Sequence, residues 1–249
     1  MSKGHHSTSG VFIAADFRDD LIIDRYDPVF ASMRASKRRR LHSVNSEDAV
    51  TWNVFRSLRQ IDSTVWLPEL FGAAFPNLPA PHASHAVVTL WKAVAPPPSF
   101  TGELEEGESE IDVVIETPAW VWFIETMSRG DGGSNAPSKR DRSQVLRDLD
   151  VGSYYAGVRP FYFSLLAADR GKSSAGAAAI GEYRDLAKPR ELLADHRPDG
   201  LANLRGVSLL TWEDLGAVLG DAATDARRED ERAFAVRARE WLGGKGLVR

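Results

Sequence analysis

Apolar residues recur at helical spacing soon after Ser46, at Val50, Val54, Leu58 and Ile61. Serine is a favoured helix-capping residue, and the carboxylates of Glu47 and Asp48 suit the positive N-terminal end of a helix. The pattern therefore predicts a helix that begins at Ser46, with one apolar face and two carboxylates in its first turn.

Runs of β-branched and aromatic residues predict the strands of a sheet. The run that ends at Val94 is stopped by three successive prolines, and a turn containing Pro118 separates two later runs. The expected strands are residues 86–94, two strands within 110–127, then 161–167 and 207–211.

Helices are expected between and after these strands, at residues 140–156, 175–186, 190–195 and 225–241. The proline-containing stretch 68–81 is expected to be a loop, and residues 1–10 are expected to be disordered. The order of helix, three strands, helix and strand predicts the α/β class, with a central mixed β-sheet flanked by helices on both faces.

Composition places the chain among globular proteins. Its 249 residues fit one large domain or one domain with a modest appendage, and 43% hydrophobic residues allow a packed core. No apolar run approaches the roughly 20 residues that span a bilayer, and residues 1–12 lack the apolar centre of a signal peptide. The absence of cysteine excludes disulfides and thiolate metal sites. We therefore expect a soluble, cytoplasmic protein with no membrane partner.

Charged residues are distributed unevenly, although the net charge is only −4. Basic residues cluster at Arg34, Lys37, Arg38, Arg39, Arg40 and His42, and again at Lys139, Arg140, Arg142 and Arg147. Acidic residues cluster between them, at Glu103, Glu105, Glu106, Glu108, Glu110 and Asp112. This order suits a metal-dependent enzyme that acts on a polyanion, whereas three solvated surface runs are the alternative reading.

The turn at residues 117–120 predicts which residues of the two flanking strands face each other. If Thr117 pairs with Trp120 across the turn, Asp112 lies directly opposite Glu125 on the neighbouring strand. Because side chains alternate along a strand, the two carboxylates also share one face of the sheet. The apolar residues expected on the opposite face are Ile111, Val113, Ile115, Trp122 and Ile124.

Two facing carboxylates destabilise a sheet unless something compensates their charge. Strands that are apolar on both faces are usually buried, and a buried pair of acids without a cation is costly. A divalent cation such as magnesium, which prefers oxygen ligands, is therefore the favoured partner of Asp112 and Glu125. The alternative is an exposed carboxylate pair at a sheet edge, with no metal.

The combination of these short motifs resembles the PD-(D/E)xK, or restriction-endonuclease-like, phosphodiesterase superfamily. The matching positions are Glu47 in SEDAVTWNVF, Asp112 in EIDVVIE, Glu125 in FIETM and Gln144 in RSQVLRDLD. The resemblance covers about residues 43–211 and implies a nuclease-like core there. It leaves residues 1–42 as a partly disordered N-terminal segment and 212–249 as a C-terminal helical extension.

By this resemblance, Asp112, Glu125 and the backbone carbonyl of Thr126 would bind Mg²⁺ or Mn²⁺. Glu47 would reach the metal directly or through water, although complementing the helix dipole is an equally good role for it. Gln144 would orient a phosphate or a water molecule, with an ordinary exposed helix position as the alternative.

Met127 departs from the family pattern, because it stands where the family has its catalytic lysine. Methionine carries no charge and donates no hydrogen bond. Three explanations remain open: an inactive member that binds nucleic acid, a basic residue supplied from elsewhere, with Lys92 and Lys139 as candidates, or a substitution of a natural lysine.

The leading hypothesis is therefore a metal-dependent endonuclease-type domain that hydrolyses DNA, of the kind used in defence, and that is inactive or impaired as written. The alternatives are a non-catalytic nucleic-acid-binding or scaffolding subunit with the same fold, and an unrelated α/β protein whose acids are structural. A homodimer or a partner subunit in a larger complex stays open. The chain has no GxxxxGK[ST], GxGxxG, HExxH or GxSxG motif, so other enzyme classes are less supported.

Overall fold

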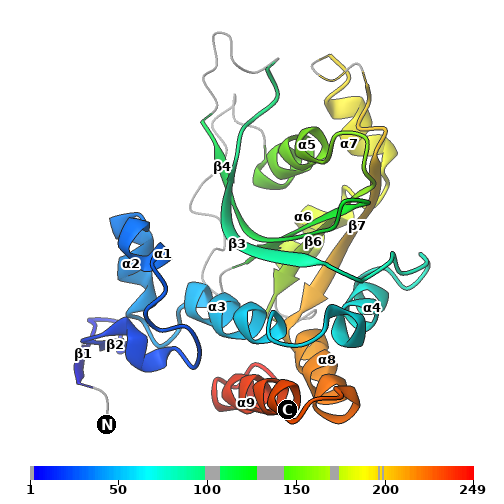
Figure 1. The fold of residues 1–249 in the computed structure, drawn as a ribbon. Helices are drawn as coiled ribbons and strands as arrows, with labels where there is room; N and C mark the ends of the chain where they lie inside the picture. The colour runs from blue at the N-terminus through cyan, green and yellow to red at the C-terminus, as the bar shows by residue number, and fades with distance from the viewer. Residues whose placement is uncertain (1–2, 99–106, 128–142, 169–173, 196, 198) are drawn as a thin grey trace.

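The computed structural model describes residues 3–98, 107–127, 143–168, 174–195, 197 and 199–249. These residues form a five-stranded mixed sheet with helices on both faces, and a small N-terminal unit that lies to one side of it (Figure 1). The α/β class predicted from the sequence is confirmed. Part of each charged cluster named above lies outside the described residues: Glu103, Glu105 and Glu106 of the acidic cluster, and Lys139, Arg140 and Arg142 of the second basic cluster.

The sheet has the strand order β3-β4-β5-β6-β7. The pairs β3/β4 and β4/β5 are antiparallel, and β5, β6 and β7 are parallel to one another. All five predicted strands are present: β3 (Val87–Val94), β4 (Ser109–Glu116), β5 (Val121–Thr126), β6 (Phe161–Ala167) and β7 (Leu204–Thr211).

Helices connect the parallel strands, as parallel pairing requires. The connection from β5 to β6 contains α5 (Gln144–Ala156), and that from β6 to β7 contains α6 (Ser174–Gly181) and α7 (Ala187–Leu192). The sequence predicts a helix near each of α5, α6 and α7. Together with the strand directions, they bring the carboxyl ends of β5, β6 and β7 to one edge of the sheet, where open α/β sheets usually bind ligands.

The two faces of the sheet bury separate apolar clusters. On one face, Val113 and Trp122 pack with helices from both ends of the described chain, beneath the sheet in Figure 1. These helices are α3 (Glu47–Leu58), α4 (Ser63–Ala74), α8 (Trp212–Asp225) and α9 (Glu229–Gly244). On the other face, Val114 and Phe123 pack against α5. The clusters follow the alternation of side chains along β4 and β5.

Ile111 is an exception to the predicted faces. It belongs to the cluster on the α5 side, not to the cluster of Val113. The alternation of β4 is interrupted at Asp112, between these two residues. On β3, Trp91 lies between the partners of Ile111 and Val113 and has a φ of 54°, which bulky side chains rarely adopt.

Helix α4 corrects the prediction that residues 68–81 form a loop, because the helix runs through Pro68 to Ala74. Asp62 caps it, and Trp66 and Phe71 are buried in the main core. Burial of these side chains outweighs the backbone hydrogen bond that proline cannot donate. Helix α8, capped by Thr211, lies within the helical extension expected at 212–249, although no separate helix was predicted at its position.

The N-terminal unit consists of short elements packed against the start of α3 (Figure 1). Their buried side chains, including Phe17, Phe30 and Leu41, pack with Trp52 of α3. The elements are β1 (Gly4–His6), β2 (Phe12–Ala14), the 3₁₀ helix η1 (Phe17–Asp20), α1 (Val29–Ser32) and α2 (Ala35–Leu41).

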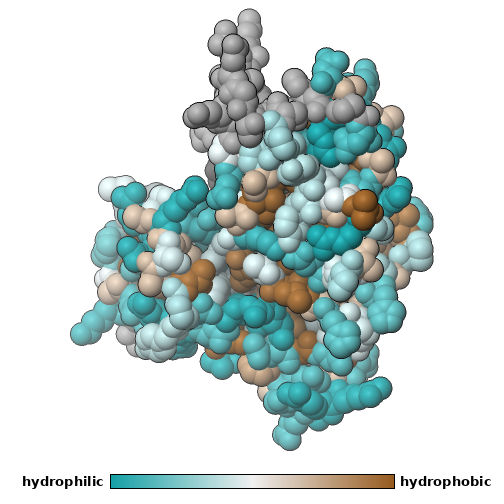
Figure 2. Space-filling model, turned by 45° about the horizontal axis from the view of Figure 1, so that its top comes forward, coloured by the Kyte–Doolittle hydropathy of each residue, from teal (hydrophilic) through white to brown (hydrophobic). Residues whose placement is uncertain are grey.

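Among the described residues, few large apolar side chains are exposed, and they are scattered over different elements. The face in Figure 2 is mainly hydrophilic, with small separate hydrophobic patches. Among the described helices, none is both long enough and apolar enough to cross a membrane.

Candidate functional site

The N-terminus of α3 forms one side of the candidate site. The hydroxyl of Ser46 accepts a hydrogen bond from the backbone N–H of Ala49 at 3.2 Å, so Ser46 caps the helix as the sequence predicts. Glu47 and Asp48 therefore lie in the first turn, where the helix dipole favours their negative charge.

The β4–β5 hairpin forms the other side, with the register predicted from its turn. Val113 pairs with Ile124, and Glu116 pairs with Val121. The regular pairing ends at Val113 and Ile124, and directly beyond it the backbone N–H of Asp112 donates to Glu125 Oε1 at 3.3 Å. The predicted juxtaposition of the two acids is thus present in the fold.

Thr126 fixes the orientation of the Asp112 carboxylate. Its backbone N–H and its hydroxyl both donate to Asp112 Oδ2, at 3.0 and 2.6 Å. Thr126 therefore touches the site as a hydrogen-bond donor. The carbonyl ligand role that the resemblance implies for Thr126 stays a prediction.

A polar pocket of about 400 Å³ lies between the helix and the hairpin. It brings together Glu47, Asp112 and Thr126, which are far apart in the sequence. Its full lining is Arg40, Ser43, Asn45, Ser46, Glu47, Asp48, Asp112 and Thr126. A pocket of this size has room for a hydrated cation together with part of a ligand.

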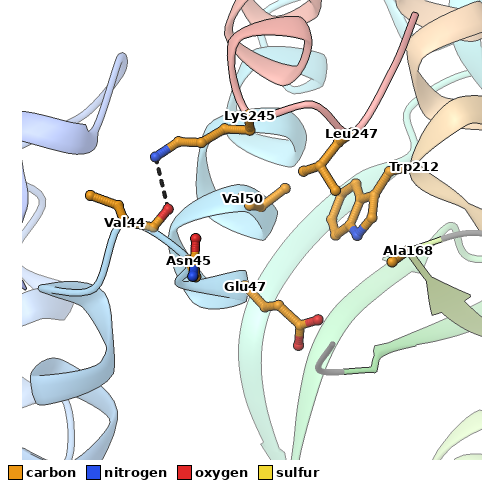
Figure 3. A pocket seen from close by; sticks show the side chains of 8 residues that line it. All are labelled: Val44, Asn45, Glu47, Val50, Ala168, Trp212, Lys245 and Leu247. Carbon is orange, nitrogen blue, oxygen red and sulfur yellow. Dashed lines mark hydrogen bonds between the residues drawn. The ribbon is translucent and has the colours of Figure 1, made fainter. Parts of the chain in front are cut away.

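Glu47 also borders a second, smaller pocket, shown in Figure 3. Its carboxylate extends from α3 toward Ala168, the residue that follows β6, and away from Lys245 (Figure 3). Glu47 thus reaches toward the carboxyl ends of the parallel strands.

Lys37 of α2 is the cation in the centre of the acidic residues, and sequence reasoning missed this role. Its buried Nζ lies 2.7 Å from Glu110 Oε1, 3.3 Å from Asp48 Oδ1 and 3.5 Å from Asp112 Oδ1. It also lies 4.7 Å from the centre of the Trp91 ring, a cation–π contact. A positive charge at this place partly neutralises the acids.

The pKa values of this cluster follow from burial and mutual interaction. Burial alone would lower the pKa of Lys37, but Asp48, Asp112 and Glu110 together raise it above its ordinary value. Burial raises the pKa of Asp48, against the opposing effect of Lys37. Lys37 therefore remains charged throughout the physiological pH range.

Glu125 is the acid whose charge the protein tolerates least. Burial of its carboxyl group, and then the charges of Asp112 and Asp148, raise its pKa well above the ordinary range. Gln144 Nε2 donates to both carboxylate oxygens of Asp148, at 2.9 and 3.0 Å. Gln144 therefore lies near the site through Asp148, and its implied contact with phosphate stays a prediction.

Neither Met127 nor Lys92 places a positive charge beside Asp112 in the structure. Met127 is partly buried and packs against the apolar cluster on the α5 side. Lys92 bonds Glu116 Oε1 at 2.7 Å and the hydroxyl of Tyr155, so it is not paired with Asp112, which corrects one of the two suggestions. Lys139 lies outside the described residues.

The sequence gives only a weak local signal for Lys37, the four-residue spacing to Leu41. Lys37 and Leu41 are four residues apart, so they share one face of α2, and both are buried while the three arginines between them are exposed. The short helix was hidden in the sequence because its basic residues suggest a fully solvated segment.

The oxygen-rich pocket suits a hard cation, but the acids do not form a complete cage. Within the described ranges, no group of three or more His, Cys, Asp or Glu side chains is arranged to hold a metal. Magnesium commonly binds through one or two carboxylates and keeps several waters, so Asp112 and Glu47 fit it in that manner.

Comparisons of the chain with protein-family models, with curated proteins and with solved structures returned no match. The case for a function therefore depends on the geometry of the pocket.

Proposed function

We propose that this chain is a metal-dependent nuclease-type hydrolase with a restriction-endonuclease-like core, acting on DNA phosphodiesters. The observation that carries the proposal is the pocket in which Glu47 from α3 meets Asp112 from β4. Glu125 does not line the pocket but lies next to Asp112, whose backbone N–H donates to its carboxylate.

The chain's own residues would hold the cation and shape its surroundings. Asp112 and Glu47 offer carboxylate oxygens, and Thr126 fixes the direction of Asp112. When bound, Mg²⁺ or Mn²⁺ supplies Lewis-acid activation and neutralises charge on the phosphoryl oxygens. Burial is the main cause that disfavours ionisation of Glu125, and a cation beside Asp112 would offset the further effect of the Asp112 charge.

Basic residues next to the acids make the pocket accessible to an anionic substrate. Lys37 offsets the charge of Asp112 and Asp48 from inside the protein, and Arg40 lines the pocket while pairing with Asp48 at 3.2 Å. Without these cations, the acids would repel a phosphodiester.

Plasmid cleavage with Mg²⁺ or Mn²⁺ tests the proposal through Asp112→Asn. This change keeps the size of the side chain and removes the charge, and we expect cleavage to fall by more than about 100-fold, the upper range for residues that only support a metal ligand. The matched control is Asp221→Asn at an exposed position of α8, which should cleave like the unchanged chain. Equal cleavage by the two variants would refute the assignment of Asp112.

A second candidate is a nucleic-acid-binding subunit that does not cut, and Met127 is the observation that favours it. The side chain packs in an apolar cluster and offers no charge to a phosphate. A gain of cutting in Met127→Lys would support the nuclease, whereas DNA binding with no gain would support the binding subunit.

A further inference from the structure

Helix α2 presents two chemically different sides. Lys37 and Leu41 are buried, whereas Arg38, Arg39 and Arg40 are exposed. A seven-residue helix with four consecutive basic residues is unstable by itself, so its position depends on the buried side.

The buried side fixes α2 to the candidate site. Lys37 contacts carboxylates of α3 and β4, and Leu41 packs in the same cluster as Trp52 of α3. These contacts join an element of the N-terminal unit directly to the acids of the pocket.

The chain that leaves α2 builds the wall of the pocket. Arg40 lines it, followed by Ser43, Asn45 and Ser46, and then α3 begins. The exposed arginines of α2 are therefore continuous with the rim of a pocket whose interior is acidic.

Arg38 and Arg39 make no ion pair with a carboxylate in the part of the chain that the structure describes. Arginine binds phosphate through two parallel N–H donors, and it is less strongly hydrated than lysine. Two such groups beside an acidic pocket complement a polyanion that extends past the pocket, and would be of no use to a small neutral ligand.

We propose that α2 is the element that binds the phosphodiester backbone of a nucleic acid beside the pocket, with Arg38 and Arg39 as the contacts and Lys37 as the anchor that positions the helix. This inference rests on the proposed function for its ligand class. It goes further because it assigns nucleic-acid binding to α2, a helix that carries none of the acids of the pocket.

The test is the salt dependence of binding, measured by fluorescence anisotropy with a labelled DNA duplex and with EDTA to prevent cleavage. The variant is Arg38→Gln/Arg39→Gln. Its matched control is Arg184→Gln/Arg205→Gln, which removes two exposed arginines that flank a different pocket, of about 460 Å³, beside the edge strand β7. Both variants lose the same charge at the surface.

We expect the α2 variant to lower the slope of log affinity against log salt by about 2, one for each lost phosphate contact, and the control to keep the original slope. Equal losses in both variants, a loss in the control alone, or no binding by the unchanged chain would overturn the inference. If cleavage that depends on Asp112 persists while the α2 variant binds normally, only the inference fails. If α2-dependent binding occurs without cleavage, only the hydrolase proposal fails.

Discussion

At the level of single residues, the ammonium group of Lys37 holds together three elements through their carboxylates. Glu110 and Asp112 belong to β4 and Asp48 to α3, while Lys37 itself belongs to α2. An ion pair removed from water is stabilising only while both charges remain, because an unpaired buried charge is costly. Lys37 should therefore contribute to the stability of the fold as well as to the charge balance of the site.

Lys37→Met should lower the free energy of unfolding by about 3 kcal/mol, because it leaves partly buried carboxylates without their buried cation. Lys92→Met is the comparison, since the side chain of Lys92 is 27% exposed whereas that of Lys37 is 5% exposed. Lys92→Met should lower the free energy of unfolding by about 1 kcal/mol or less. Urea denaturation measures the free energy of unfolding of each variant. Equal losses of stability in the two variants would contradict the central role of Lys37.

Glu125→Gln tests the raised pKa of Glu125 through its effect on stability. Because the pKa in the folded state lies above that in the unfolded state, the protonated carboxyl stabilises the fold at acidic pH. This stabilisation is lost as pH rises through the folded-state pKa. Glutamine resembles the protonated form at every pH, so the variant should gain stability over the unchanged chain as pH rises from 5 to 8.

The measurement is urea denaturation at both pH values without divalent cations. A stability difference between the two chains that does not change with pH would mean that Glu125 ionises normally in the fold.

At the level of elements, the hairpin could be predicted and α2 could not. The turn around Pro118 and the alternation of β4 and β5 are local features, and they bring Asp112 next to Glu125 at the end of the paired strands. The helix cap at Ser46 is also predicted by a local sequence pattern. The docking of Lys37 against Glu110 spans 73 residues and depends on packing that no short pattern contains.

Two helices show why local signals fail elsewhere. Pro68 indicates a break, yet α4 continues through it because its apolar side chains are buried against α8 and the sheet. The start of α8 at Trp212 follows β7 directly, so the sequence offers no loop to separate them. In both cases tertiary burial decides the structure.

At the level of the whole molecule, segments from both ends of the chain support the candidate site. Lys245, which follows α9, donates to the carboxylate of Asp20 at 2.7 Å and to the backbone carbonyl of Val44 at 3.0 Å. Val44 precedes α3, so this contact ties the C-terminal segment and the N-terminal unit to the start of the helix that carries Glu47 (Figure 3). The division at residues 43 and 211 stays a prediction.

The most direct test of the account is plasmid cleavage by Met127→Lys compared with Met127→Lys/Asp112→Asn, with Mg²⁺ or Mn²⁺. Position 127 follows the last residue of β5 and is next to Thr126 in the sequence, two residues after Glu125. A lysine there supplies a positive charge that methionine lacks. We expect the single variant to cleave at least as fast as the unchanged chain and the double variant to be inactive. Cleavage that survives the loss of Asp112, or no cleavage by any form with either metal, would contradict a metal-dependent hydrolytic site at this pocket.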